Sequence, residues 1–482
     1  MSITGALNNA VSGLTVNARM AEVVSSNLSN ALTDGYGRRS VEISSVQVGE
    51  RGGGVMVDAI NRFVDAGILA DRRLADAALN GQERSAGMLS RLEQMLGEPG
   101  DRAGLVSRIA AVESALISAS SDPASTTRLA NILTAFDELA QTLQSNTKSV
   151  QSLRQEADGA IARDIDILNR SLAQVEHLNA DILRISGSGN DTSALLDARQ
   201  RAVDQIATLV PVREVTRENG TVSLMTVNGF GLLDSKAVQF EFTRTPTITA
   251  DMTLTSGALS GIMVDGVAID PPTGIGRLEG GAIGAAFAMR DRTLVEVQKG
   301  LDTIAADLIA RFQDPANDPT LGPADVGILT DEGGVLDLTD LEGLAGRISV
   351  NVALSPGEGG NLTAFRDGLG AVVVGPVGDP AQLNRWITAL GDGRADVPGA
   401  ATQSTSGRAA TFTSELGATR LAAEEQLGFS NARWETLRQT ELANGVDTDM
   451  ELQTLLQVEQ AYAANARVIQ TVDFMIQRLM EI

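Results

Sequence analysis

The first thirty residues carry one stripe of apolar and small side chains at helical spacing. Between them only Arg19 and Glu22 are charged, and the opposite face is Ser, Thr and Asn. Such a segment is marginal as an isolated helix in water, because these polar residues have modest helix propensity. The pattern therefore predicts a helix that becomes ordered against a partner. The stripe consists of Ile3, Leu7, Val11, Leu14, Ala18, Ala21, Leu28 and Leu32.

The last thirty residues carry a matching stripe whose spacing alternates between three and four. Asn465 interrupts it at one seam position, where an amide can set the register of two packed helices. Two interpretations remain open: an antiparallel helix pair that closes one domain of the chain, or a surface that is buried between subunits. The stripe consists of Leu455, Val458, Tyr462, Ile469, Val472, Ile476 and Leu479.

Helical periodicity also dominates much of the interior. Asp122 before Pro123 predicts a break between helices, and residues 187–191 predict a turn. We expect the chain to stay helical to about residue 210. The amphipathic segments run over residues 105–116, 161–182, 294–312 and 416–442.

A β-rich insertion is predicted after Pro211. Asn219-Gly220 and Asp265-Gly266 each separate two short apolar runs, which is the signature of a tight hairpin. Phe240, Phe242, Ile248 and Leu254 add strand-like alternation. Further predicted elements are a loop over 314–327, strands over 348–354 and 371–374, a helix over 382–390 and an exposed linker over 399–407.

These patterns predict an α+β fold with a helical, coiled-coil axial region and β-rich outer insertions. We divide the chain into an axial domain of residues 1–35 and 445–482, a mainly helical core of residues 36–210, 280–313 and 408–444, a β-hairpin region over 211–279, and a mixed outer domain over 314–407.

Composition narrows the class of function. The chain of 482 residues has 61 acidic and 38 basic side chains, a formal charge of -23, and no basic run. Nucleic acid binding and attraction to anionic membranes are therefore disfavoured, and no apolar run is long enough to span a bilayer. We expect neither a nucleic-acid partner nor membrane insertion.

The chain also lacks most of the side chains that enzymes use. It has no cysteine and a single histidine, His177, which excludes thiolate chemistry and multi-histidine metal sites. Ser145 and Lys148 match a bare S-x-x-K without its companion motifs, and the glycines near residue 280 make no phosphate-binding loop. The acidic residues between 331 and 342 lack the spacing of a calcium loop. We therefore predict no cofactor, no metal and no enzymatic activity.

Motifs at both ends resemble one known family. Residues 26–38, Ser-Asn-Leu-Ser-Asn-Ala-Leu-Thr-Asp-Gly-Tyr-Gly-Arg, follow Ser12-Gly13-Leu14 and resemble the N-terminal signature of bacterial flagellar rod, hook and hook-associated proteins. Residues 459–469, Glu-Gln-Ala-Tyr-Ala-Ala-Asn-Ala-Arg-Val-Ile, are similar to the C-terminal motif of that family. Both tyrosines of the chain, Tyr36 and Tyr462, fall inside these motifs.

The interior resembles the hook-associated members of the family. Hook proteins turn to β-structure soon after the Gly-Tyr motif, whereas this chain is expected to remain helical. Residues 191–200, the hairpin at Asn219-Gly220, the helix up to Phe312 and Asn444-Gly445-Val446-Asp447 are similar to the hook-associated pattern.

The resemblance implies a structural adaptor, exported by the flagellar type III route, that joins hook to filament outside the cell. It implies as partners the hook protein, a second hook-filament junction protein, further copies of this chain, and a cytosolic export chaperone at the C-terminal region. The axial packing residues would be Ile3, Leu7, Leu14, Leu28, Tyr36, Leu455, Tyr462, Asn465, Ile469 and Ile476. The alternatives are a hook or rod protein of the same family, a self-contained soluble binding module and, remotely, a flagellum-associated hydrolase.

Overall fold

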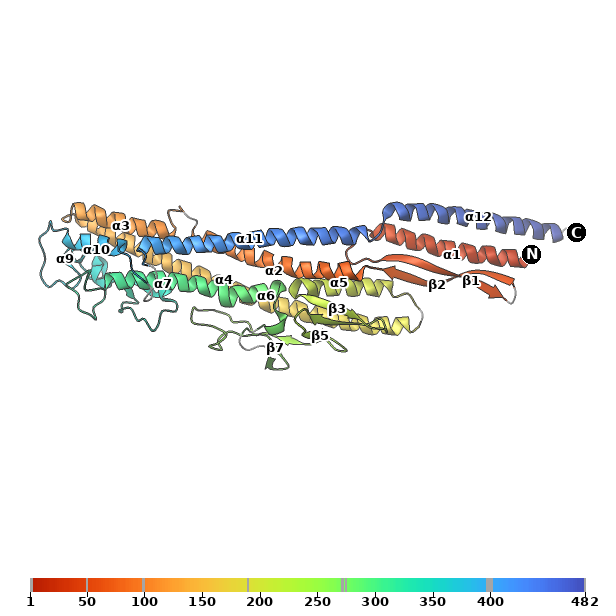
Figure 1. The fold of residues 1–482 in the computed structure, drawn as a ribbon, viewed down its shortest axis with the longest axis horizontal. Coiled ribbons are helices and arrows are strands. Elements are labelled where there is room, and N and C mark those ends of the chain that lie inside the picture. The colour runs from red at the N-terminus through yellow and green to blue at the C-terminus, as the bar shows by residue number, and fades with distance from the viewer. Residues whose placement is uncertain are drawn as a thin grey trace.

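Both ends of the chain lie at the same tip of an elongated molecule (Figure 1). The computed structural model describes residues 3–48, 51–97, 100–188, 190–269, 273, 275–395 and 402–480. Long helices run along the molecule and small antiparallel sheets lie at its side, so the predicted α+β class with a helical axial region is confirmed.

The tip is formed by two helices and a β-hairpin, which we call the terminal arm. The hairpin lies along α1, and α12 packs beside α1. The elements of the arm are α1 (Ile3–Asn30), β1 (Arg38–Val48), β2 (Arg51–Phe63) and α12 (Thr448–Met480).

The hairpin contradicts the expectation that the chain stays helical to residue 210. Apolar side chains alternate with polar ones at Val41 and Ile43 on β1, and β2 carries the apolar run Val55-Met56-Val57. This period of two, with β-branched residues, favours a strand over a helix. By their contacts, residues 38–63 lie with the terminal helices rather than with the helical core to which we assigned them.

The rest of the molecule, which we call the body, is built on long helices. Asp65 caps α2 by accepting a hydrogen bond of 2.9 Å from the Gly67 amide, and Ser125 caps α4. The predicted break at Asp122 is confirmed, because α3 ends one residue before it. The main helices are α2 (Ala66–Leu96), α3 (Leu105–Ser121), α4 (Thr126–Ser186), α5 (Ser193–Leu209), α6 (Gly281–Ala288), a π-helical turn (Met289–Thr293), α7 (Leu294–Phe312) and α11 (Thr405–Ala443).

Both predicted hairpins of the β-rich insertion are present. Gly220 has φ +78°, and Asp265 and Gly266 have φ 51° and 74°, which is the left-handed turn geometry that the dipeptides favour. Of the four residues with predicted strand-like alternation only Phe240 lies in a strand; Phe242, Ile248 and Leu254 do not, although Ile248 is buried. The strands are β3 (Val212–Thr216), β4 (Val222–Thr226) and β5 (Gly231–Leu233) in one sheet, and β6 (Phe240–Glu241), β7 (Met263–Val264) and β8 (Val267–Ala268) in another.

The region after α7 is mostly irregular. The predicted loop over 314–327 has no helix or strand, and the helix predicted over 382–390 is α10. The strand predicted over 371–374 is wrong, because no segment among the described residues pairs with it and the side chain of Val372 is 97% exposed. The elements are β9 (Leu329–Asp331), α8 (Leu344–Arg347), β10 (Ile348–Val350), α9 (Ala364–Asp367), α10 (Ala381–Gly391) and 3-10 turns at Val352–Leu354 and Pro356–Glu358; a further 3-10 turn, Gly276–Leu278, precedes α6.

Two other boundaries also differ from the predictions. The strand predicted over 348–354 stops at Val350 and continues as a 3-10 turn. Part of the linker predicted over 399–407 lies outside the described residues, and Thr405 already begins α11 with its side chain buried. The predicted turn over 187–191 lies where α4 ends, although residue 189 is outside the described residues.

Two apolar clusters stabilise the body. The larger one joins α3, α4 and α7 to the outer region, and its centre is aromatic, with Phe136 against Phe312 at 5.0 Å between ring centroids. The smaller one joins α4, α5 and α6 to the β-rich insertion. The glycines near residue 280 allow close packing, because a Cβ atom on Gly281 would lie 2.3 Å from the Leu209 carbonyl oxygen.

Candidate assembly site at the paired termini

The two terminal helices run side by side and approach closely at one glycine (Figure 1). A Cβ atom on Gly13 would lie 2.7 Å from the side-chain nitrogen of Asn465. Gly13 belongs to the N-terminal motif and Asn465 to the C-terminal motif, so the structure brings the two motifs into contact. The predicted role of Asn465 in setting register is a proposal that this contact supports.

Within the chain, the predicted axial residues are only partly covered. Half-buried side chains are those of Ile3, Leu7, Leu14, Leu28, Tyr36, Leu455, Asn465 and Ile469, and the exposed ones are Tyr462 and Ile476. The residues of α1 that the chain buries are instead Ala10, Val16, Asn17, Val23, Val24 and Asn27. The stripe predicted on α1 is therefore rotated away from the contacts that the monomer makes.

The outer face of α12 is strongly apolar and open to solvent. Among its described residues only Glu451, Val458 and Val472 are buried. Large apolar side chains that remain exposed are Leu452, Leu456, Tyr462, Phe474, Met475, Ile476, Leu479 and Met480. So many exposed apolar side chains on one helix are typical of an interaction site.

A polar cluster at the C-terminal end of α1 explains why the N-terminal motif contains Asn27 and Tyr36. Asn27 is fully buried, and its side chain accepts hydrogen bonds from the Tyr36 hydroxyl (2.8 Å) and the Arg39 amide (3.0 Å) and donates one to the Arg39 carbonyl oxygen (2.8 Å). Ser26 also contacts the Tyr36 hydroxyl. Burial raises the pKa of Tyr36 above its ordinary value of 10.0, so the phenol stays protonated as a donor. The motif thus fixes the turn from α1 into β1.

A carboxylate of the body contacts this cluster. Asp197 on α5 accepts hydrogen bonds from the Gly37 amide (3.0 Å), Arg39 Nη2 (2.6 Å) and Arg62 Nε (2.6 Å). On the other side, Arg38 donates to the buried carboxylate of Glu451 on α12 at 2.8 Å. Sequence reasoning assigned no role to Arg62, Asp197 or Glu451, since only the fold brings them to the motif.

A second charge cluster joins α2, α5 and α11 just beyond the arm. Arg72 pairs with Asp76, Asp204 and Glu441, and Arg73 pairs with Asp204 and Glu214. Four carboxylates thus share two guanidinium groups. Burial, in a cluster with excess negative charge, raises the pKa of Asp76 and of Glu441 above their ordinary values.

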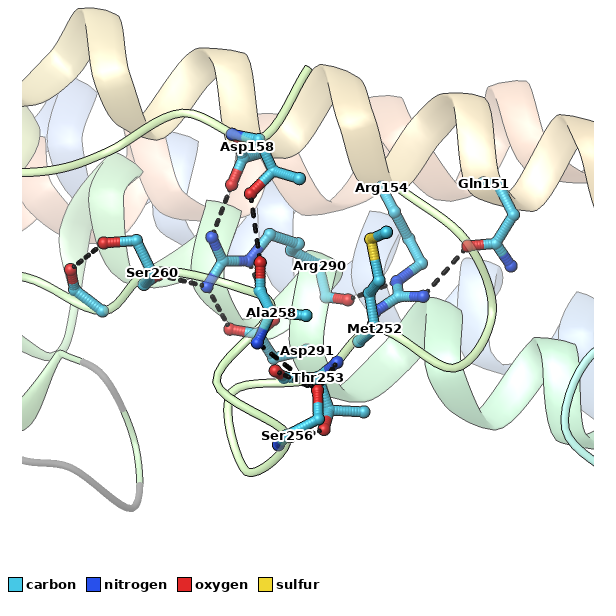
Figure 2. Close-up of polar contacts among 12 residues, drawn as sticks. Gln151, Arg154, Asp158, Met252, Thr253, Ser256, Ala258, Ser260, Arg290 and Asp291 are labelled. Atoms are coloured by element: carbon cyan, nitrogen blue, oxygen red, sulfur yellow. Dashed lines mark hydrogen bonds and ion pairs between the residues drawn. The ribbon is translucent and has the colours of Figure 1, made fainter. Parts of the chain in front are cut away.

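Buried arginines also attach the β-rich insertion to α4 (Figure 2). Arg290, in the π-helical turn, donates to Asp158 at 2.6 Å, and both side chains are inaccessible to solvent. Arg154 donates to the carbonyl oxygens of Thr249 and Met252 (3.0 and 2.7 Å), and burial lowers its pKa. These groups are saturated by protein partners, so their role is structural.

The described residues contain no group of three or more His, Cys, Asp or Glu side chains that is arranged to hold a metal ion. Asp331, from the acidic stretch considered above, is instead bound by Arg347 at 2.9 Å. His177 lies exposed on α4. Among the described helices, none is long and apolar enough to cross a membrane.

Comparison with known proteins points to one class. A family model described as flagellar hook-associated protein FlgK helical domain matches residues 89–317, and one described as flagellar basal body rod FlgEFG protein C-terminal matches residues 443–482. The second match covers α12, the helix whose apolar face is open. The chain therefore resembles flagellar axial proteins.

Individual relatives narrow the class to a family. Flagellar hook-associated protein 1 of Escherichia coli is 26% identical over 64% of this chain and 56% of its own length, and the Salmonella typhimurium protein of the same name is 26% identical over 62% and 54%. The protein of that name from Bacillus subtilis is 21% identical over 98% of this chain and 97% of its own length. The chain is therefore similar to flagellar hook-associated protein 1, in agreement with the resemblance of its motifs and interior.

The matches to the first two relatives cover only part of each relative. The chain spans little more than half the length of the first two relatives. A solved structure, of the flagellar hook junction protein FlgK from Burkholderia pseudomallei, has a TM-score of 0.44 and 19% identity over 54% of this chain and 46% of that chain. At that score the overlap carries no argument about this protein.

Proposed function

We propose that this chain is a structural adaptor that joins the hook to the filament of a bacterial flagellum and assembles through its terminal arm. The observation that carries the proposal is the set of exposed apolar side chains along α12, a helix that lies outside the apolar clusters of the body. Such a face stabilises a subunit contact once a neighbour covers it, at about 25 cal/mol for each Å² of apolar area.

The proposal includes the route and the partners that the family resemblance implies. The chain would be exported from the cytoplasm by the type III route, with a chaperone on its C-terminal region until export. Outside the cell it would contact the hook protein, a second junction protein and copies of itself. The arm would line the axis while the body faces solvent, and no reaction is required.

One observation favours the second candidate, a hook or rod protein of the same axial family. The hairpin β1–β2 directly follows the Gly-Tyr motif, and this is the feature that we expected of hook proteins rather than of this chain. Because residues 38–63 form a hairpin, this segment does not distinguish a hook-associated protein from a hook protein. The family-model match over residues 89–317 supports the junction adaptor.

Deleting the gene in its source bacterium distinguishes these candidates. We expect intact hooks without filaments, with flagellin released into the medium as monomer, when the structures on the cells are imaged by electron microscopy. Missing hooks would favour the hook or rod role instead. Normal filaments would contradict both.

A point substitution tests the surface itself. Ile469→Asp places a charge in the proposed axial contact, where an unpaired buried carboxylate costs several kcal/mol. We expect the purified monomer to fold and the strain to make hooks without filaments. Gln470→Asp, on the exposed neighbouring position, is the matched control and should assemble. Normal filament formation with Ile469→Asp would remove this stripe from the assembly surface.

A further inference from the structure

The terminal arm is attached to the body by very little chain. Only Val64–Asp65, between β2 and α2, and residues 444–447, between α11 and α12, connect them. The arm extends beyond the body along the long axis of the molecule (Figure 1). The angle between the two parts therefore depends on the noncovalent contacts at the joint.

One carboxylate is central to that joint. Asp197 is 4% exposed and comes from α5, whose other face is held in the body core by Val203 and Ile206. Each of its oxygens accepts a charged hydrogen bond from the hairpin, from Arg62 at Oδ1 and from Arg39 at Oδ2. Charge-assisted bonds of 2.6 Å to a buried carboxylate are among the stronger contacts in a protein.

The hairpin cannot hold these arginines together by itself. Arg39 on β1 and Arg62 on β2 are direct partners in the strand register. Like charges placed opposite each other on adjacent strands destabilise a hairpin. A carboxylate bound between them turns this repulsion into attraction, and in the described structure that carboxylate comes from the body.

The surrounding residues extend the contact into both parts. Arg62 also donates to the Gly35 carbonyl oxygen (3.2 Å) and to the Gln200 side chain of α5. A Cβ atom on Gly37 would lie 2.5 Å from Arg62 Nε, so the glycine leaves room for Arg62 to reach Asp197. The Arg39 guanidinium lies 4.9 Å from the centre of the Tyr36 ring, and Tyr36 is bonded to Asn27 of α1.

We propose that Asp197 is the positioning residue that fixes the orientation of the terminal arm on the body, by holding Arg39 and Arg62 between the strands of the hairpin and helix α5. Loss of its charge leaves two opposed guanidinium groups without compensation at the joint. The arm then samples a range of angles about its two connections. That assembly needs a fixed angle rests on the proposed function. The orientation of the arm is a property of the single chain and does not rest on it.

The experiment measures the angle in the purified full-length chain. Because the sequence has no cysteine, two introduced cysteines can be labelled specifically. Ser45→Cys on β1 and Gln174→Cys on α4 are both exposed and place one spin label on the arm and one on the body. The distance distribution between them, from pulsed electron resonance, reports the orientation.

We expect a narrow distribution in the parent chain and a broad or shifted one with Asp197→Asn. Added salt should narrow the distribution of the variant, because it screens the repulsion between Arg39 and Arg62, and should leave that of the parent unchanged. Asp197→Glu should restore part of the narrow distribution. If Asp197→Asn does not fold, Arg62→Gln removes the same contact from the arm side and should broaden the distribution.

Asp204→Asn is the matched control. Asp204 lies on the same helix and pairs with Arg72 and Arg73 inside the body, so its loss removes ion pairs without touching the arm. We expect its distance distribution to match that of the parent. A narrow, unshifted distribution with both Asp197→Asn and Arg62→Gln, or a broad one in the parent, would overturn the proposal.

Filament assembly in cells separates this inference from the proposed function. If Asp197→Asn broadens the distribution and lowers the number of filaments, the fixed angle serves assembly. If the distribution broadens and filaments form normally, Asp197 still positions the arm, and the need for a fixed angle at the junction is refuted. Neither result depends on which surface of α12 packs in the axis.

Discussion

Helices α7 and α12 begin from the same kind of sequence and end in opposite environments. Both carry an apolar stripe at spacings of three and four. In α7, Leu301, Ile304 and Leu308 are fully buried among α4, α8 and α11. In α12, Val458 and Val472 are buried, but Tyr462 and Leu479 of the same stripe are 47% and 61% exposed. Periodicity therefore reports that a face will be buried, and it does not report whether the covering surface comes from the same chain.

Hydrogen exchange gives the largest expected difference between the two helices. Amides of α7 should exchange only through global unfolding, which for a domain costs about 5–15 kcal/mol. Amides over residues 3–33 and 450–480 should exchange much faster, since α12 packs mainly on α1. Mass spectrometry on a chain shown to be monomeric by sedimentation checks this. Equal protection of α7 and α12 would mean that the arm is a stable unit by itself.

Much of the body could be predicted from the sequence because its signals are local. The Asn219-Gly220 and Asp265-Gly266 turns need positive φ, and Pro123 disfavours helix at Asp122, so each element is marked by its own residues. The stretch from Ala371 to Val374 misled for the opposite reason. Its β-branched residues favour a strand, but a strand requires a pairing partner, and no described segment supplies one.

The assembly site at the paired termini could be predicted only in part, because the motifs identify its residues but not the contacts that these residues make. Gly37 and Arg38 lie within the N-terminal motif, yet their partners Asp197 and Glu451 come from segments 160 and 413 positions further along the chain. Such pairs arise from tertiary packing, and the local periodicity of the sequence carries no information about them. The hairpin that carries Arg62 was missed because helical expectation was extended past Gly35.

The body, unlike the open arm, contains a fully buried ion pair, Arg290–Asp158, and should lose stability when one of its charges is removed. Arg290→Met leaves the Asp158 carboxylate unpaired at a site with no solvent access. Removing one partner of a buried ion pair costs about 3–5 kcal/mol. Denaturant unfolding measures the loss. Arg292→Met, whose side chain is 71% exposed, is the control and should change stability by less than about 0.5 kcal/mol. Similar losses in both variants would contradict the structural role of the pair.

A smaller effect is expected where the two arm helices touch. Gly13→Leu forces the helices apart at Asn465, and overpacking of this kind costs about 1–3 kcal/mol. The readout is faster amide exchange in α12. Gly87→Ala is the control, because space around Gly87 is open and alanine favours a helix by roughly 0.5–1 kcal/mol. In the double variant Gly13→Ala/Asn465→Ala the new Cβ atom no longer meets the Asn465 amide, so the protection of the α12 amides should be restored. If it is not restored, the two helices make their contact elsewhere.

The smallest expected effect is a pH dependence at the second charge cluster. The folded-state pKa of Asp76 is raised above 3.8, its ordinary value, mainly by burial. Above pH 3.8 the folded chain therefore binds more protons at this site than the unfolded chain, and the contribution of Asp76 to stability falls as the pH rises through the folded pKa. Asp76→Asn removes that term, so its stability relative to the parent should increase from pH 4 to pH 7, as followed by denaturant unfolding. Asp71→Asn, at an exposed position on the same helix, is the control variant. A decrease with rising pH for Asp76→Asn would mean that the ion pair with Arg72 outweighs the burial of the carboxylate.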